Sequence, residues 1–252
     1  LERDIQWSDS KNLLIFGAGA LVGTLTPGAC RVSIETKNVF NNGKGSANVG
    51  GHFGPELKYA GFDHIVISGK SDRPVYLWIE SGRAELRDAK LIWGKTTFET
   101  EEMLEKEHGF KKIRVASIGP AGENLVRGSG IVCDRAKVAG GSGVGCVMGD
   151  KKLKAVVVCG QGGSIKVAEP DRFFQAVDIA LKKVGESPLS EMMKKITLAG
   201  RWSDPKSANW DYLISARNGQ DDFWEIEKRV KLTNQETGFP KYRKSISACF
   251  MC

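Results

Sequence analysis

The chain has 252 residues, and glycine stands out among them, with 30 positions against a usual share of about 7%. Hydrophobic residues make up 41% and charged residues 27% of the chain, which excludes a disordered or collagen-like protein. The net charge of +7 comes from 37 basic and 30 acidic residues that are interspersed, so the sequence predicts no nucleic-acid-binding surface.

The first part of the chain is predicted to be rich in β-strands. Residues 1–163 hold 26 of the 30 glycines. A β-hairpin is predicted over 74–87, with its turn at 80–83. Short runs of β-branched and aromatic residues between glycine turns predict strands at 12–16, 31–35, 64–68, 75–79, 84–87, 113–117 and 155–159.

Two helices are predicted, one within the β-rich part and one after it. The first covers 97–108, with Thr97 or Thr100 as the N-cap and Gly109 as the stop. The second begins at Glu169, because apolar residues recur from there at spacings of three and four.

The change in pattern near Gly163 predicts two domains and an α+β fold. Residues 1–165 are expected to form a β-rich, double-sheet domain, and 166–252 the start of a mainly helical domain. The chain opens on Leu1 without an initiator methionine and stops on the second cysteine of a pair. We therefore expect a piece of a longer polypeptide.

The sequence predicts a cytoplasmic protein without a membrane span. The longest apolar stretch, 13–23, is short and rich in glycine, and no basic-then-apolar leader opens the chain. Of the six cysteines, four are single and two are clustered at the end, a distribution typical of intracellular proteins rather than of a disulfide framework.

Three glycines after the first predicted strand are similar to a dinucleotide-binding fingerprint. Their spacing, Gly17, Gly19 and Gly23, is G-x-G-x-x-x-G rather than the usual pattern. Pro27 and Gly28 follow so closely that no room remains for the helix whose N-terminus would hold a pyrophosphate. We therefore assign these glycines to turns and packing and not to a Rossmann site.

Two denser glycine segments, 47–54 and 139–145, are the candidate ligand loops. Successive backbone amides without a Cβ can form concavities that bind anions and let a charged ligand approach the main chain. Arg31 and Lys137 lie near these loops in sequence, which suits a phosphorylated cofactor. Tight turns in a glycine-rich sandwich explain the same glycines equally well, and spacing alone leaves both interpretations open.

The chain ends in a C-x-x-C pair, Cys249 and Cys252, a spacing typical of iron–sulfur, zinc or redox dithiol sites. A thioredoxin-type dithiol follows a strand and opens a helix, which residues 244–248 hardly provide, so a cluster or metal motif is favoured. Single cysteines in apolar or glycine-rich runs are interpreted as small buried residues: Cys133, Cys146 and Cys159.

Four motifs follow one another along the chain: 48–63 (NVGGHFGPELKYAGFD), 87–89 with 92–95, 118–126 (IGPAGENLV), and 143–149 with 153–155. Together they resemble the aldehyde ferredoxin oxidoreductase family, tungsten enzymes that carry a bis-pterin cofactor beside a 4Fe–4S cluster. The likeness runs from about residue 12 to 166 and resumes at the terminal cysteines. Four long motifs in order make the resemblance specific.

The resemblance implies a place for the pterin and its magnesium ion. Arg31 matches the arginine that lies between pterin and cluster. Asn48 and Val138 match positions whose backbone carbonyls hold a magnesium ion that bridges the two pterin phosphates. Lys137 falls where the family has a phosphate-contacting arginine, a change that keeps the charge and loses the bidentate geometry.

The resemblance also implies a role for the two loops and the cysteine pair. The glycines expected to approach the cofactor are Gly50, Gly51, Gly140 and Gly141. Gly141 stands where many relatives have arginine, so one cofactor contact differs. Cys249 and Cys252 match the first two cluster ligands of a C-x-x-C-x-x-x-C run. We expect Arg31 and both loops to converge on one face, with the cysteine pair nearby.

The activity that the resemblance implies is oxidation of an aldehyde to a carboxylic acid by a tungsten or molybdenum bis-pterin enzyme, with electrons passed through the cluster to ferredoxin or an iron–sulfur subunit. Residues 209–210 and 222–224 look similar to the tungsten subunit of class II benzoyl-CoA reductases, so reduction of an aryl-CoA is the alternative. A non-catalytic electron-transfer or scaffold subunit is the alternative from another class. We expect an oligomer, and no catalytic acid or base is assigned.

Overall fold

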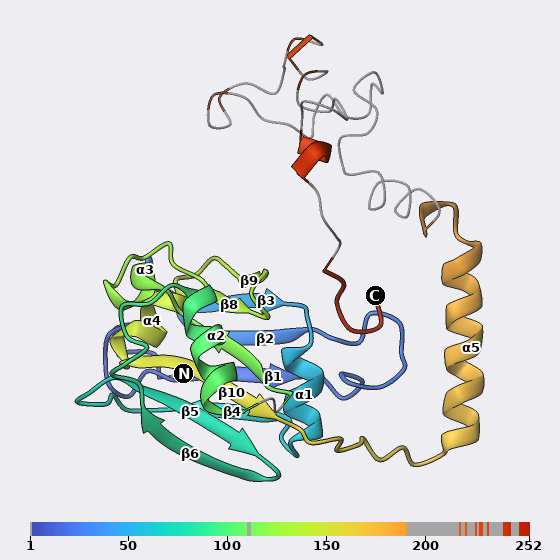
Figure 1. Cartoon of the computed structure of the whole chain (residues 1–252), viewed down its shortest axis with the longest axis horizontal. Coiled ribbons are helices and arrows are strands. Elements are labelled where there is room, and N and C mark those ends of the chain that lie inside the picture. Colours follow the sequence, from blue (N-terminus) through green and yellow to red (C-terminus); the bar gives the residue numbers. More distant parts are fainter. Residues whose placement is uncertain are drawn as a thin grey trace. The chain divides into compact units, whose positions relative to one another are not determined.

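The computed structural model describes residues 2–109, 112–190, 239–242 and 247–252, together with 217, 220, 225, 227, 228 and 231. The chain divides into two compact units, Leu1–Val177 with Ala248–Cys252, and Asp178–Ser247. Both β-sheets and the C-terminal cysteines belong to the first unit (Figure 1). Within the second unit the structure describes the end of a long helix and a short 3-10 turn, Phe239–Tyr242. The division at residue 165 stays a proposal.

One layer of the first unit is a four-stranded antiparallel sheet with the strand order β3-β2-β1-β4. Its strands are β1 (Leu14–Ala18), β2 (Val32–Lys37), β3 (Lys44–Val49) and β4 (His64–Ile67). Alternate residues of β1 and β3 are buried, because successive side chains point to opposite faces of a sheet.

The pairing of β1 confirms that the glycines at 17–23 form no Rossmann site. β1 is antiparallel to both of its neighbours, whereas a dinucleotide-binding unit needs a parallel strand after a crossover helix. Gly23 has φ +83°, and a Cβ there would lie 2.8 Å from Cδ1 of Ile165. Turn geometry and close packing therefore account for this glycine.

The other layer is a six-stranded sheet with the order β6-β5-β10-β7-β8-β9. Its strands are β5 (Val75–Glu80), β6 (Arg83–Asp88), β7 (Arg114–Ser117), β8 (Ile131–Cys133), β9 (Lys137–Ala139) and β10 (Leu153–Cys159). The predicted β5–β6 hairpin is confirmed, and Ser81 and Gly82 form its tight turn with φ +49° and +76°.

Strand β10 joins the two halves of the core because every one of its residues is buried. Val156 and Val158 belong to the cluster that includes Phe16 and Ile34 of the four-stranded sheet. The alternate residue Val157 belongs to a second cluster on the other face, with Tyr76, Trp78 and Leu104. This double-sheet arrangement with covering helices confirms the predicted α+β fold.

The helices are α1 (Phe53–Tyr59), α2 (Thr97–Glu107), α3 (Pro120–Glu123), α4 (Val144–Asp150) and α5 (Pro170–Glu186). Both predicted helices, α2 and α5, are confirmed. The N-cap of α2 is Thr96 rather than Thr97 or Thr100, because Thr96 and Glu99 form a reciprocal capping box. None of the described helices is long and apolar enough to cross a membrane.

Several described elements were not predicted: β3, β8, β9, α1, α3 and α4. In β3 the sequence KGSANV lacks the bulky residues that mark a strand, and pairing with β2 decides its structure. Helix α4 is rich in glycine because backbones approach it closely. A Cβ on Gly145 would lie 2.5 Å from the carbonyl oxygen of Gly130.

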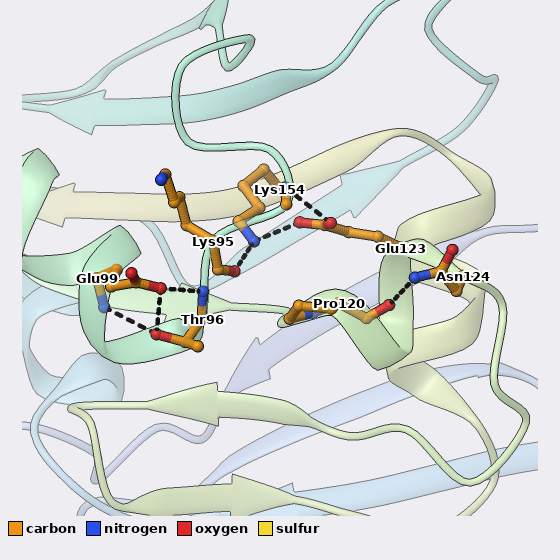
Figure 2. A network of polar contacts seen from close by, with 8 residues as sticks. Lys95, Thr96, Glu99, Pro120, Glu123, Asn124 and Lys154 are labelled. Atoms are coloured by element: carbon orange, nitrogen blue, oxygen red, sulfur yellow. Dashed lines mark hydrogen bonds and ion pairs between the residues drawn. The ribbon is translucent and has the colours of Figure 1, made fainter.

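A buried ion pair ties the segment before α2 to α3, and Figure 2 shows this network. The side chain of Lys154 on β10 is fully buried, and its ammonium donates to the carboxylate of Glu123 and, at 2.7 Å, to the carbonyl of Lys95. The other oxygen of Glu123 accepts the N–H of Gly94 at 2.8 Å. Burial lowers the pKa of Lys154.

Candidate cofactor site at the junction of two sheet edges

The candidate site lies where β3, an edge strand of the four-stranded sheet, contacts β9, an edge strand of the six-stranded sheet (Figure 1). Ser142 follows β9 and bridges the two edges. Its hydroxyl accepts the N–H of Ser46 and donates to the Ser46 carbonyl, both at 3.2 Å. The N–H of Val39 donates to the Ser142 carbonyl at 3.3 Å. These contacts bring the two predicted glycine loops side by side.

Asp134, in the turn between β8 and β9, ties the first loop to the six-stranded sheet. Its Oδ2 accepts the N–H of His52 at 2.5 Å and that of Phe53 at 3.2 Å, at the start of α1, where a carboxylate is favourable. Gly51 has φ +107°, and a Cβ there would collide with the Asp134 carboxylate. Asp134 is not among the residues that the sequence predicts for the site. An acid in a turn three residues before Lys137 is a weak local signal for it.

Only one of the two carboxylate oxygens of Asp134 makes these contacts. Its Oδ1 is buried and has no hydrogen-bond partner. A buried polar atom without a partner costs free energy, so such an atom next to the glycine loops is a feature to be explained by function or by a bound group.

Gly50 is required by the side chains that surround it. A Cβ at this position would lie 3.0 Å from Sγ of Cys249, 3.7 Å from Nη1 of Arg31 and 3.7 Å from Sγ of Cys30. Arg31, which is predicted to lie between pterin and cluster, therefore faces the same small space as Cys249, a predicted cluster ligand.

The glycines of the second loop are not required by packing. Gly140 and Gly141 are exposed, and a Cβ on Gly141 would meet nothing within 4 Å. Gly141 has φ +83°, which favours glycine, so a tight turn explains it. Gly140 has neither a positive φ nor a close neighbour: a Cβ there would meet only a methyl of Val138, at 3.9 Å. Bare, accessible backbone next to Lys137 is what the close approach of a ligand requires.

The C-terminal segment is held beside the first loop by two backbone hydrogen bonds. The N–H of Phe250 donates to the Gly51 carbonyl at 3.2 Å, and the N–H of Gly28 donates to the Met251 carbonyl at 2.8 Å. The N–H of Cys252 donates to the carbonyl of Cys249 at 3.2 Å, which closes a turn within the pair. The cysteine pair is therefore anchored to the first unit.

The ring of Phe250 adds an aromatic contact to this anchor. It meets the ring of His52 edge-on, with centroids 6.3 Å apart, and that of Tyr59 edge-on at 6.5 Å. Tyr59 is itself oriented by its hydroxyl, which donates to the Gly23 carbonyl at 2.7 Å. Helix α1 thus serves as the platform for the terminal segment.

Cys30 lies beside the terminal pair, although the sequence shows it only as a single cysteine. It is buried, with 4% of its surface exposed, and its sulfur borders the same space beside Gly50 as that of Cys249. Burial raises the pKa of the Cys30 thiol, and the backbone of Gly51 opposes this rise. Cys30 and Cys249 are far apart along the chain, so the sequence does not reveal that they are close in space.

The remaining predicted residues have clear positions. Asn48 is exposed on β3 opposite Ser33, and Val138 lies on β9 opposite Val132 with 55% of its surface exposed. Across the described part of the chain, no three His, Cys, Asp or Glu side chains form a ready metal site. The three single cysteines predicted to be buried are so: Cys133, Cys146 and Cys159.

This arrangement belongs to a known class of proteins. The family model described as the N-terminal domain of aldehyde ferredoxin oxidoreductase matches residues 1–160, and the chain therefore belongs to that family. The resemblance predicted from the four motifs is confirmed.

Curated relatives carry the names of tungsten enzymes. Tungsten-containing aldehyde ferredoxin oxidoreductases of Pyrococcus horikoshii and Pyrococcus furiosus are 43% and 44% identical over 180 residues, which are 71% of this chain and 30% of each relative. The WOR-like subunit of an aliphatic sulfonate oxidoreductase of Pyrococcus furiosus is 37% identical over 174 residues, 64% of this chain and 28% of that protein. The chain thus spans less than a third of the length of these relatives.

A solved structure matches the whole chain. It is the active site complex BamBC of benzoyl coenzyme A reductase with 1,5-dienoyl-CoA, with a TM-score of 0.81 at 32% identity, covering 100% of this chain and 39% of that one. The predicted likeness to a benzoyl-CoA reductase subunit is therefore also confirmed.

Proposed function

We propose that this chain is the cofactor-cradling part of a tungsten bis-pterin, iron–sulfur oxidoreductase that oxidises aldehydes to carboxylic acids and passes the electrons to ferredoxin. The observation that supports this proposal is the meeting of Arg31, Gly50 and Cys249 at one point, with Lys137 against the adjacent Gly51, where a built Cβ would lie 3.3 Å from Cγ of Lys137. Relatives at 43% to 44% identity are named tungsten-containing aldehyde ferredoxin oxidoreductases.

The residues present fit a phosphorylated pterin. Lys137 would contact a phosphate, and the bare backbone at Gly140 and Gly141 would let the cofactor approach the main chain. The carbonyls of Asn48 and Val138, on the two adjoining edge strands, would hold magnesium. Oxygen ligands are what a hard divalent cation prefers.

The terminal pair fits an iron–sulfur cluster. Cys249 and Cys252 would supply two thiolate ligands, and Arg31 would lie between cluster and pterin with donors for both. When bound, the tungsten pterin supplies oxygen-transfer chemistry, and the cluster supplies electron transfer. The chain itself contributes binding, orientation and positive charge.

Metal analysis of the full-length protein tests this proposal. We expect tungsten or molybdenum together with iron, and aldehyde-dependent reduction of a viologen dye. A protein that binds neither tungsten nor molybdenum would instead support a non-catalytic scaffold or electron-transfer subunit. Replacing Lys137 with alanine should lower the tungsten content and leave the iron content unchanged.

Reduction of an aryl-CoA thioester is the second candidate function. It is favoured by one observation: the match to a chain of the BamBC complex covers the whole of this chain, beyond the residues matched by the family model. Reduction of an aryl-CoA by the metal-loaded protein, without activity on aldehydes, would replace the first candidate.

The proposed electron partner is ferredoxin or an iron–sulfur subunit in an oligomeric, cytoplasmic complex. The name of the BamBC complex and that of the WOR-like subunit both describe proteins that act with other subunits. Purification of the native protein under anaerobic conditions should recover such a subunit, or the protein should reduce ferredoxin directly.

A further inference from the structure

We propose that the thiol of Cys30 donates a hydrogen bond to Sγ of Cys249 and thereby raises the reduction potential of the iron–sulfur cluster that the terminal pair would ligate. The inference rests on the proposed function, since it takes Cys249 as a cluster ligand. It concerns a residue to which neither the four motifs nor the C-x-x-C spacing assigns a role.

The two sulfurs approach one another over Gly50. A Cβ built on Gly50 would lie 3.0 Å from the sulfur of Cys249 and 3.7 Å from that of Cys30, so both sulfurs border the same space. Cys30 is buried while Cys249 is partly exposed, which places Cys30 on the protein side of the pair.

Backbone contacts hold Cys30 in this position. The N–H of Cys30 donates to the Gly28 carbonyl at 2.8 Å, and the N–H of Gly28 donates to the carbonyl of Met251, also at 2.8 Å. The loop that carries Cys30 is therefore tied to the segment that carries Cys249. A shift of one segment would have to move the other.

Cys30 is placed to donate to a ligand rather than to act as one. The Cys30 thiol has one S–H to donate, and the sulfur of Cys249 borders the same space beside Gly50. Cys30 is buried whereas Cys249 is partly exposed, so we treat Cys30 as a positioning residue behind the ligand.

A donor at a cluster thiolate has a predictable electrostatic effect. Reduction adds an electron to the cluster and its ligands, so a hydrogen bond to a ligand sulfur stabilises the reduced state more than the oxidised state. Removing that donor disfavours reduction and lowers the potential. Loss of Cys30 should therefore leave the cluster in place and make it harder to reduce.

The test is a redox titration of the cluster, followed by electron paramagnetic resonance in the full-length, cluster-loaded protein. Cys30→Ala should shift the midpoint potential downward, with the iron content and signal shape of the unaltered protein. Cys30→Ser keeps a donor, so its midpoint potential should lie closer to that of the unaltered protein. Cys30→Val fills the site without a donor and gives the same test if the alanine variant does not fold.

Cys159→Ala is the matched control, because Cys159 is equally buried, at 2% exposed, and lies at the end of β10 in the cluster around Trp78. Its potential should equal that of the unaltered protein. An unchanged potential in both Cys30→Ala and Cys30→Val overturns the proposal, and so does loss of iron in Cys30→Ala, which would make Cys30 a ligand.

A variant at Cys249 separates this inference from the proposed function. Cys249→Ala should lose the cluster. If it keeps the full iron content and the same spectrum, the cluster assignment itself is wrong and the hydrogen-bond proposal is overturned with it. If it loses iron while Cys30→Ala keeps the original potential, only the role of Cys30 is refuted.

Discussion

At the scale of single residues, the most perturbed carboxyl described is that of Glu101 on α2. It is 6% exposed, accepts the N–H of Arg135 at 3.1 Å and lies 3.6 Å from the Arg135 guanidinium. Burial raises the pKa of Glu101 to about 7, although the charge of Arg135 lowers it. Glu101 thereby connects α2 to the turn that carries Asp134.

We expect Glu101→Gln to flatten the pH dependence of stability. The pKa of Glu101 is higher in the folded than in the unfolded state, so the protonated carboxyl stabilises the fold below about pH 4.5, and this contribution is lost as the pH rises through 7. Between pH 5 and 8 the unaltered chain should lose about 2.5 kcal/mol that the variant does not lose. Urea unfolding measures the difference.

The matched control is Glu102→Gln, the neighbouring residue on the same helix, whose side chain is 59% exposed. Its stability should follow the pH dependence of the unaltered chain. Equal pH dependence in all three proteins would show that Glu101 does not carry the effect.

Gly50 sets the distance between the first loop and the cysteine pair. Gly50→Ala would place a methyl group 3.0 Å from Sγ of Cys249, so the sulfur must move. We expect a folded protein with a lower iron content in the full-length form, measured as iron per chain. Gly128→Ala, where a Cβ meets nothing within 4 Å, should keep the original iron content. Equal iron in both variants would contradict the role of Gly50.

At the scale of elements, β10, α3 and the segment before α2 depend on the buried pair of Lys154 and Glu123, whose side chains are 0% and 5% exposed. Breaking a buried pair leaves one charge without compensation. We expect Lys154→Met or Glu123→Leu alone to destabilise the chain by about 3–5 kcal/mol. The double variant should recover most of that loss, as a double-mutant cycle measured by urea unfolding would show.

The exposed pair of Lys106 and Glu102 on α2 is the comparison for this cycle, with side chains 74% and 59% exposed. Its loss should cost about 0.5 kcal/mol or less, because solvent screens the charges. If loss of the buried pair costs as little stability as loss of this exposed pair, the buried ion pair does not stabilise the link between α3 and the segment before α2.

At the scale of the whole first unit, the terminal segment shields Cys30. Phe250 contacts the rings of His52 and Tyr59, and Cys30 is only 4% exposed beneath this segment. Without a cluster, Phe250→Ala should loosen the segment and speed alkylation of Cys30 severalfold, because burial limits thiol reactivity. Mass spectrometry of the Cys30 peptide measures the rate.

Phe40→Ala is the control for this measurement, because Phe40 is 62% exposed and its ring has no place in the terminal anchor. The alkylation rate of Cys30 should stay at its original value there. An unchanged rate in Phe250→Ala would mean that Phe250 does not hold the segment over Cys30.

The sequence by itself determined the elements whose signals are local. The β5–β6 hairpin and β10 follow from β-branched runs between turn residues, and α2 follows from its acidic first turn and stop signal. The four motifs determined the family, because long stretches in a fixed order carry more information than any single spacing. Sequence also indicated both glycine loops, but not why each glycine is there.

Only the tertiary structure decided which residues meet. The contact of edge strands β3 and β9 brings the two glycine loops together, and Asp134 ties the first loop to the turn between β8 and β9. The docking of the last five residues puts Cys249 beside Cys30 and Gly50. These partners are far apart in the chain, so no local pattern encodes their proximity; it arises from sheet order and packing, which the fold imposes as a whole.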